Sequence, residues 1–269
     1  PELSHSKTMN KAKRTVVYRG HWNSVLVEII DQGKTRTLYF GGNVLQSSID
    51  LSAPHRLYLS YTRYMMSGLL FKPAPQNILM VGLGAGSMVH FLHHHYPDSR
   101  IDVVEHAELV IELARGYFSL PENSQVTIHC ADGYDFIRAH PNKTYDLVII
   151  DAFDHRGMAA NIYNQSYLRQ LKKVLVDTGL VSFNLWSGNQ DKMIEIRALV
   201  ENDFNCLLEF PVYNRGNVIC LASDSLTRPH LLRLRNAVIS SASKRFSIDF
   251  KPIINQGLTS RTVRKQVCV

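Results

Sequence analysis

Glycine and acidic residues follow apolar runs at several points along this chain, and these residue types can bind a nucleoside and move a proton. The apolar run NILMV precedes three glycines at alternate positions, Gly82, Gly84 and Gly86. Glycine permits a tight turn in which backbone amides approach a ligand closely. Glu105 follows Gly84 by 21 positions and ends the run RIDVV. A carboxylate at that point can accept hydrogen bonds from ribose hydroxyls.

Two further apolar runs also end in acids. VTIHCA precedes Asp132 and Gly133, and YDLVII precedes Asp151, with Asp154 three positions later. We expect Asp132 to recognise an adenine amino group. A carboxylate such as Asp151 can act as a general base.

The glycine spacing distinguishes between classes of nucleotide. A dinucleotide-binding fingerprint has a third glycine or alanine three positions after the second glycine, which allows close packing of the next helix. Ser87 occupies that position here. The pattern therefore fits an S-adenosyl nucleoside, which has no pyrophosphate, better than a nicotinamide or flavin nucleotide. A further alternative is a sheet protein whose acids only cap helices.

An alternation of strands and helices is predicted to position these residues. Continuous apolar runs are typical of strands buried on both faces of a parallel sheet, and such sheets bind ligands at the carboxyl ends of their strands. We predict an α/β, Rossmann-like fold of the S-adenosylmethionine-dependent methyltransferase type. The strands are expected at 77–84, 100–106, 126–132, 145–153, 179–186, 206–213 and 217–223, and the helices at 87–95, 107–118, 133–139, 166–175 and 189–203.

The N-terminal part has a different pattern. Short β-branched and aromatic runs at 16–20, 25–33 and 35–42 are separated by glycine turns, which predicts β-hairpins. A helical pattern covers 54–70, and a linker with two prolines follows at 72–76. We therefore predict a small β-hairpin domain with a connecting helix over 1–70, and a Rossmann-like nucleoside-binding catalytic domain over 71–269.

Composition restricts the partners and the compartment. The net charge is +7, but residues 228–269 alone hold nine Lys or Arg against one Asp or Glu. No nucleic-acid recognition motif accompanies this basic segment, so we expect a solvated face or an oligomer contact such as that of a homodimer. No apolar run reaches the ~18 residues of a membrane helix. The four cysteines form no CxxC pair, and no signal-peptide pattern is present, which predicts a soluble cytoplasmic protein.

A run of histidines could indicate a metal site. His90 and His94 are one helical turn apart, next to His93 and His95. Only Asp98 is nearby as a further ligand, and no cysteine is. We expect a solvated helix end and no bound metal.

The ordered set of residues resembles the spermidine and spermine synthases, the polyamine aminopropyltransferases. The resemblance covers about residues 16–224 and includes the hairpin domain, which ordinary methyltransferases of this fold usually lack. Its most diagnostic part is the pair Asp151 and Asp154, which matches the family's Asp-x-x-Asp-Pro with His155 in place of the proline. By resemblance, the nucleoside-binding residues are Gln46, Gly82, Gly84, Gly86, Glu105, Asp132 and Gly133; the catalytic residues are Asp151 and Tyr61; and the acceptor-binding residues are Asp154 and Tyr213.

The resemblance implies transfer of an aminopropyl group from decarboxylated S-adenosylmethionine to a small-molecule amine. A primary amine has a pKa of ~10.4 and is mostly protonated at neutral pH, so it needs a base before it can attack. Asp151 would be that base, with Tyr61 assisting. Two alternatives stay open: methyl transfer from S-adenosylmethionine on the same fold, and a non-catalytic binding module.

The chain also departs from the family pattern. Ala85 replaces an acid of the glycine loop, and Arg63 stands near a position where an acid is expected. A dication that is stripped of water needs carboxylates at both ends, because an uncompensated buried charge is costly. We therefore expect that putrescine is not the preferred acceptor and that an amine with a neutral or anionic tail fits better.

Overall fold

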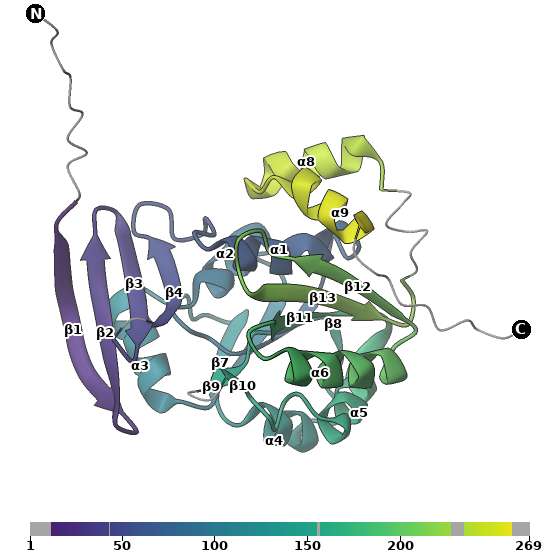
Figure 1. The fold of residues 1–269 in the computed structure, drawn as a ribbon, viewed down its shortest axis with the longest axis horizontal. Coiled ribbons are helices and arrows are strands. Elements are labelled where there is room, and N and C mark those ends of the chain that lie inside the picture. The colour runs from purple at the N-terminus through teal and green to yellow at the C-terminus, as the bar shows by residue number, and fades with distance from the viewer. Residues whose placement is uncertain (1–11, 43, 155–156, 227–233, 260–269) are drawn as a thin grey trace, which may run out of the picture.

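Two β-sheets lie side by side in the computed structural model, which describes residues 12–42, 44–154, 157–226 and 234–259 (Figure 1). The smaller sheet is antiparallel, and its four strands follow the chain order. The fourth strand was not predicted, because its sequence VLQSSID lacks the β-branched and aromatic pattern of the others. Pairing with the third strand holds it in place. The strands are β1 (Arg14–Trp22), β2 (Val25–Gln32), β3 (Thr35–Phe40) and β4 (Val44–Asp50).

The larger sheet has seven strands in the order β12-β13-β11-β8-β5-β6-β7, and it confirms the predicted Rossmann-like fold. Five neighbouring strands, β11, β8, β5, β6 and β7, are parallel to one another. At the other edge, β13 pairs antiparallel with β11, and β12 pairs antiparallel with β13. The carboxyl ends of β5, β6, β7, β8 and β11 therefore share one edge of the sheet. The strands are β5 (Asn77–Val81), β6 (Arg100–Glu105), β7 (Val126–Cys130), β8 (Tyr145–Ile150), β11 (Leu175–Trp186), β12 (Cys206–Pro211) and β13 (Asn217–Ser223).

Helices cover both faces of this sheet, which is why its central strands β5 and β8 are mostly apolar. Figure 1 shows helices on both sides of the sheet. Each face has its own cluster of buried apolar side chains. The helices predicted between strands are α2 (Ser87–His95), α3 (Glu108–Phe118), α4 (Gly133–Ala139), α5 (Gln165–Lys173) and α6 (Gln190–Asp203).

The helix predicted over 54–70 is shorter than expected. Residues 54–59 form turns, and a bridge between Leu57 and Ile49 holds this segment beside β4. The helix α1 (Ser60–Met65) follows, and a 3₁₀-helix, η1 (Met66–Leu70), completes the segment. Both pack against the large sheet, where Ser182 donates a hydrogen bond to the carbonyl of Met65. The predicted domain boundary after residue 70 stays a prediction.

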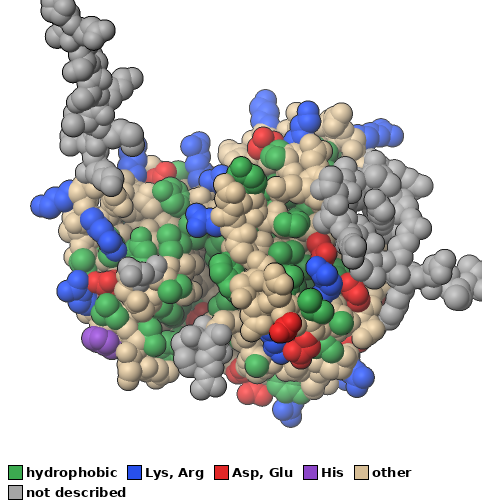
Figure 2. Space-filling model, in the orientation of Figure 1, with side chains coloured by type: hydrophobic (Ala, Val, Ile, Leu, Met, Phe, Trp, Pro, Cys, Tyr) green, Lys and Arg blue, Asp and Glu red, His purple; other side chains and the backbone are tan. Residues whose placement is uncertain are grey.

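The small sheet packs against α3 and the glycine loop of the large sheet. Its inner face contributes Val27, Ile29 and Leu38 to a buried cluster that also contains Ala85 and Phe118. Figure 2 shows the surface hollowed between the two sheets, with hydrophobic side chains on both sides of the hollow. The small sheet can therefore form one wall of a site at the edge of the large one.

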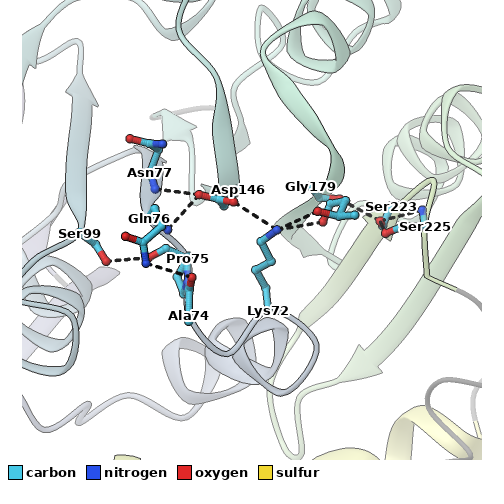
Figure 3. Close-up of polar contacts among 11 residues, drawn as sticks. Lys72, Ala74, Pro75, Gln76, Asn77, Ser99, Asp146, Gly179, Ser223 and Ser225 are labelled. Atoms are coloured by element: carbon cyan, nitrogen blue, oxygen red, sulfur yellow. Dashed lines mark hydrogen bonds and ion pairs between the residues drawn. The ribbon is translucent and has the colours of Figure 1, made fainter.

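The linker at 72–76 is pinned to the amino ends of the strands, opposite the candidate site (Figure 3). One oxygen of Asp146 accepts hydrogen bonds from the backbone amides of Gln76 and Asn77, each at 2.9 Å. The other oxygen lies 3.2 Å from the ammonium of Lys72, which also donates to the hydroxyl of Thr178 at 3.0 Å. These contacts fix the start of β5 against β8.

Two C-terminal helices, α8 (Asn236–Phe246) and α9 (Phe250–Thr259), cover the α1 face of the large sheet. The hydroxyl of Tyr64 on α1 donates to Gln256 on α9 at 2.7 Å. Lys244 and Arg245 are exposed, as the basic composition suggested, while residues 228–233 and 260–269 of the basic segment lie outside the described residues. Within the described part of the chain, no helix is long and apolar enough to span a membrane.

Candidate functional site

The carboxylate of Asp151 is held from two sides at the carboxyl end of β8. Its Oδ2 accepts a hydrogen bond from the hydroxyl of Tyr61 at 3.1 Å, and its Oδ1 accepts one from the side-chain amide of Asn184 at 2.7 Å. Its backbone amide donates to Val81 at the end of β5. The structure therefore brings together Tyr61 and Asp151, the two residues predicted to be catalytic.

Burial dominates the electrostatics of this pair. Desolvation raises the pKa of the Asp151 carboxyl, the hydrogen bonds from Asn184 and Tyr61 oppose that rise, and the negative charge of Glu105 adds to it. Desolvation and the adjacent Asp151 raise the pKa of the Tyr61 hydroxyl well above its usual range. A carboxylate with a raised pKa is a stronger base than an exposed one, and Tyr61 stays a hydrogen-bond donor.

Gln46 reaches the site through a bulge in β4. Leu38 pairs with Ser47 and Tyr39 pairs with Leu45, so Gln46 between them has no partner on β3. A bulge bends its strand and redirects the extra residue. The backbone carbonyl of Gln46 lies 3.5 Å from the Tyr61 hydroxyl. The small sheet thus contacts the catalytic pair directly, while a role of the Gln46 side chain toward the nucleoside stays a prediction.

Asn184 was missed by the sequence analysis. It lies on β11, is 2% exposed, and its Oδ1 accepts a hydrogen bond from the side chain of Asn217 at 2.9 Å. The hydroxyl of Tyr163 donates to its backbone carbonyl at 2.9 Å. A continuous chain of hydrogen bonds therefore runs from Asn217 through Asn184 to Asp151. The sequence feature that could have indicated Asn184 is an asparagine near the end of GLVSFNLW, a mostly apolar run typical of a buried strand.

The glycine loop after β5 adopts backbone conformations that favour glycine. Gly82, Gly84 and Gly86 have φ values of 97°, 56° and 75°. A Cβ on Gly82 would lie 2.2 Å from the backbone oxygen of Asp151, so the loop passes directly against the end of β8. Only glycine allows this approach.

Glu105 holds the same loop from β6. It is 8% exposed, and its Oε2 accepts a hydrogen bond from the amide of Leu83 at 3.0 Å. Its Oε1 accepts one from the amide of Ala107 at 2.9 Å. Each carboxylate oxygen can accept a second hydrogen bond, so Glu105 can shape the loop and still receive a ribose hydroxyl. The ribose contact itself stays a prediction.

Asp132 caps α4. Its Oδ1 accepts hydrogen bonds from the amides of Tyr134 and Asp135 at 2.8 and 3.2 Å, and its Oδ2 accepts one from Asn161. Gly133 begins the helix, where a Cβ would lie 2.8 Å from Val81 and from Ile162. Capping, which the sequence left open, is therefore one role of Asp132, and adenine recognition stays a prediction.

The two residues predicted to bind the acceptor stand in different situations. Asp154 ends the short strand β9 (Phe153–Asp154), which pairs with β10 (Gly157–Met158), and its side chain lies outside the part that the structure describes, as does His155. Tyr213 lies in the turn between β12 and β13 and is 71% exposed. Neither assignment is tested by these positions.

Ala85 and Arg63, the two departures from the family pattern, make their contacts with residues other than Asp151. Ala85 is fully buried in the cluster between the small sheet and α3. The guanidinium of Arg63 donates to the backbone carbonyls of Leu57 and Tyr58 at 2.9 and 3.0 Å, and so it caps the turn before α1. The expectation about the acceptor therefore has to rest on other residues.

The histidines at the end of α2 are only partly solvated. His94 is exposed, but His90 donates a hydrogen bond to the carbonyl of Phe118 at 2.8 Å, and burial lowers the pKa of its ring. The rings of His55 and His94 stack with centroids 3.9 Å apart. Among the described residues, no group of three His, Cys, Asp or Glu is arranged to hold a metal ion.

Known proteins are similar to this chain in sequence and in fold. The sequence pattern of the spermine/spermidine synthase domain matches residues 59–202. A polyamine aminopropyltransferase of Chromobacterium violaceum is 33% identical over 234 residues, which are 86% of this chain and 88% of the relative. A spermidine synthase in complex with the transition-state analogue AdoDATO superposes with a TM-score of 0.69 at 15% identity, over 91% of this chain and 84% of that one.

A methyltransferase also shares the fold. Human methyltransferase-like protein 13 in complex with SAH superposes with a TM-score of 0.61 at 22% identity, over 79% of this chain and 98% of that one. At that identity the likeness concerns the fold alone. The match over more than half of the chain and the 33% identity decide the family. The chain belongs to the spermine/spermidine synthase family.

Proposed function

We propose that this protein transfers an aminopropyl group from decarboxylated S-adenosylmethionine to an amine. The observation that carries the proposal is the pair Tyr61 and Asp151, joined at 3.1 Å where β8 ends beside the glycine loop. Family membership supports the reaction class, since two of the relatives that match most of this chain are named polyamine aminopropyltransferases.

In this proposal, Asp151 prepares the acceptor. Its carboxylate attracts the ammonium of the amine and takes one proton, for which the raised pKa of the carboxyl is suited. The freed nitrogen lone pair attacks the propyl carbon that is bonded to the sulfonium. The new C–N bond forms as the C–S bond breaks, and its electron pair goes to sulfur, which leaves neutral methylthioadenosine. Tyr61 and Asn184 hold Asp151 in position throughout.

The residues around the glycine loop suit the nucleoside part of the donor. The loop brings its backbone close to the end of β8, and the buried carboxylate of Glu105 lies on the loop amide of Leu83. Gln46, Asp132 and Gly133 complete the proposed nucleoside site. No residue of this set needs a metal to act in the reaction as proposed.

Methyl transfer is the rival reaction, because it uses the same fold and the same nucleoside site. The decisive experiment supplies either S-adenosylmethionine or its decarboxylated form, together with a panel of amines, and measures the thioether nucleoside released. Methylthioadenosine from the decarboxylated donor supports aminopropyl transfer. Release of S-adenosylhomocysteine from the intact donor would instead identify the reaction as methyl transfer. If the protein binds a donor but releases neither thioether nucleoside, it is a binding module.

A further inference from the structure

Trp186 lies on the same strand face as Asn184, one pleat beyond the catalytic carboxylate. In the parallel pairing of β11 with β8, Phe183 lies opposite Ile150, and so Asn184 stands level with Asp151. Side chains two residues apart in a strand share a face and are separated by about 6–7 Å along it. Trp186 therefore lies beyond Asn184 along β11, on the face of the sheet from which Tyr61 approaches.

The indole of Trp186 is held there by two glycines. A Cβ on Gly188 would lie 2.1 Å from its Nε1, and a Cβ on Gly216 would lie 2.8 Å from its Cη2, so the ring rests directly on both backbones. The amide of Ser187 donates to the carbonyl of Gly216 at 2.7 Å and ties the two segments together. The position of the ring is thus fixed before any ligand arrives.

The segment that follows Asp151 also reaches Trp186. The backbone amide of Trp186 lies 3.3 Å from the sulfur of Met158 on β10, which pairs with β9 directly after Asp151 and Ala152. Figure 1 shows β9 and β10 next to the end of β11. Trp186 as a residue is nevertheless 42% exposed. A large, fixed aromatic surface at the carboxyl edge of an α/β sheet is where such folds bind ligands.

The two segments of chain that contact the Trp186 ring bear on the kind of ligand. Segment 184–190, NLWSGNQ, and segment 211–217, PVYNRGN, contain no Asp or Glu, and the second contains the exposed Arg215 and Tyr213. An aromatic face binds an apolar chain well and a cation weakly, but it does not neutralise a desolvated ammonium as a carboxylate does. These segments therefore favour an uncharged tail over a second cation.

We propose that Trp186 is a specificity-determining residue that binds the tail of the acceptor, and that the acceptor is a primary amine with one cationic nitrogen and an apolar chain. This proposal rests on the proposed function, because it places the amine nitrogen at Asp151 and the tail along the indole.

The test separates binding from chemistry. Binding of 1-hexylamine and of putrescine is measured by calorimetry on the protein saturated with methylthioadenosine, for the wild type and for Trp186→Ala, Trp186→Phe and Trp186→Glu. One apolar group in a pocket changes specificity by about 10- to 200-fold, so Trp186→Ala should weaken hexylamine binding about tenfold or more. Trp186→Phe should retain most of it, and Trp186→Glu should shift the preference toward putrescine. Ile194→Ala, which removes an exposed apolar side chain on α6, is the matched control and should change neither affinity.

The outcomes distinguish the two proposals. The protein could prefer hexylamine through Trp186 and yet release no methylthioadenosine from the decarboxylated donor. That result overturns aminopropyl transfer but supports the tail site. Tighter binding of putrescine by the wild type, or an unchanged preference in Trp186→Ala and Trp186→Glu, overturns the tail site whatever the turnover.

Discussion

The side-chain amide of Asn184 lies 2.7 Å from Oδ1 of Asp151 and donates to it, while the Tyr61 hydroxyl occupies Oδ2. The carboxylate thus has a fixed orientation before the amine arrives. Fixed orientation of a catalytic group lowers the entropic cost of reaching the transition state.

Removal of the Asn184 amide should change the pH dependence of the reaction. The hydrogen bond from Asn184 lowers the pKa of Asp151 against the effect of burial, so Asn184→Ala should raise that pKa. The base is then protonated at higher pH, and the acidic limb of the kcat/KM profile should move upward by about one to two pH units, since a hydrogen bond to a charged group contributes ~1.5–3 kcal/mol and one pKa unit corresponds to ~1.4 kcal/mol. Asn217→Ala, which only loosens Asn184, should move the limb less. An identical limb in all three proteins would show that Asn184 does not act on the base.

Asp151 should act in chemistry rather than in nucleoside binding. Asp151→Asn keeps the shape of the side chain but removes the base, so turnover should fall by ~10²–10⁴. Methylthioadenosine affinity, measured by calorimetry, should stay close to that of the wild type. Normal turnover of the variant on an identified amine would refute the proposed mechanism.

The same variant should change how stability depends on pH. Burial raises the pKa of Asp151 in the folded state above its unfolded value of 3.8. The folded protein therefore binds the proton more tightly, and the free energy of unfolding should fall as pH rises from the unfolded pKa through the folded one. Asp151→Asn lacks this carboxyl, so urea unfolding between about pH 4 and pH 8 should show a shallower fall. An equal or steeper fall in the variant would contradict the raised pKa.

The strand ends that carry the site were predictable because apolar runs fix the strands of a buried parallel sheet. Their carboxyl ends then had to meet at one edge, which brought the glycine loop, Glu105 and Asp151 together. The family motif added Tyr61, whose contact with Asp151 depends on a helix that is far away in the sequence. The strand predictions rest on the spacing of apolar residues and on the connection rules of parallel sheets, both of which can be read from local sequence.

What the sequence did not reveal depends on pairing in space. β4 has a polar sequence and exists because β3 offers hydrogen bonds, and Gln46 is turned by a bulge that only the register defines. Asn184 looked like one polar residue in a strand until β11 was placed beside β8. Ala85 and Arg63 were assigned to motif positions by resemblance alone, and the packing of the first and the capping contacts of the second needed the structure.

Glu105 should affect both the nucleoside and the loop that binds it. Glu105→Ala removes the acceptor for the amides of Leu83 and Ala107 as well as the proposed ribose contact. Methylthioadenosine binding should weaken by ~1–3 kcal/mol, the usual cost of leaving a buried hydrogen-bonding group without its partner. Glu105→Gln keeps one acceptor oxygen and should lose less affinity. Calorimetry gives the affinities and thermal unfolding gives the accompanying loss of stability; unchanged affinity in a folded Glu105→Ala protein would remove the ribose assignment.

Gly82 should couple the nucleoside loop to the catalytic carboxylate, and a comparison of two glycines isolates that coupling. Gly41 and Gly82 both have positive φ, at 61° and 97°, so alanine at either site incurs backbone strain of ~1–2 kcal/mol. A Cβ on Gly41 meets nothing within 4 Å, whereas one on Gly82 would lie 2.2 Å from the backbone oxygen of Asp151.

Relief of that clash has to move the end of β8, because the amide of Asp151 is bonded to Val81 in the same segment. Gly41→Ala should therefore lower the melting temperature slightly and leave turnover intact. Gly82→Ala should lose more stability and, at a temperature where both variants are folded, at least about tenfold in kcat/KM, because a misplaced base is an inefficient one. Equal kcat/KM in the two variants would mean that the loop accommodates the Cβ without displacing Asp151. The conformation of the nucleoside loop would then not affect the position of the base.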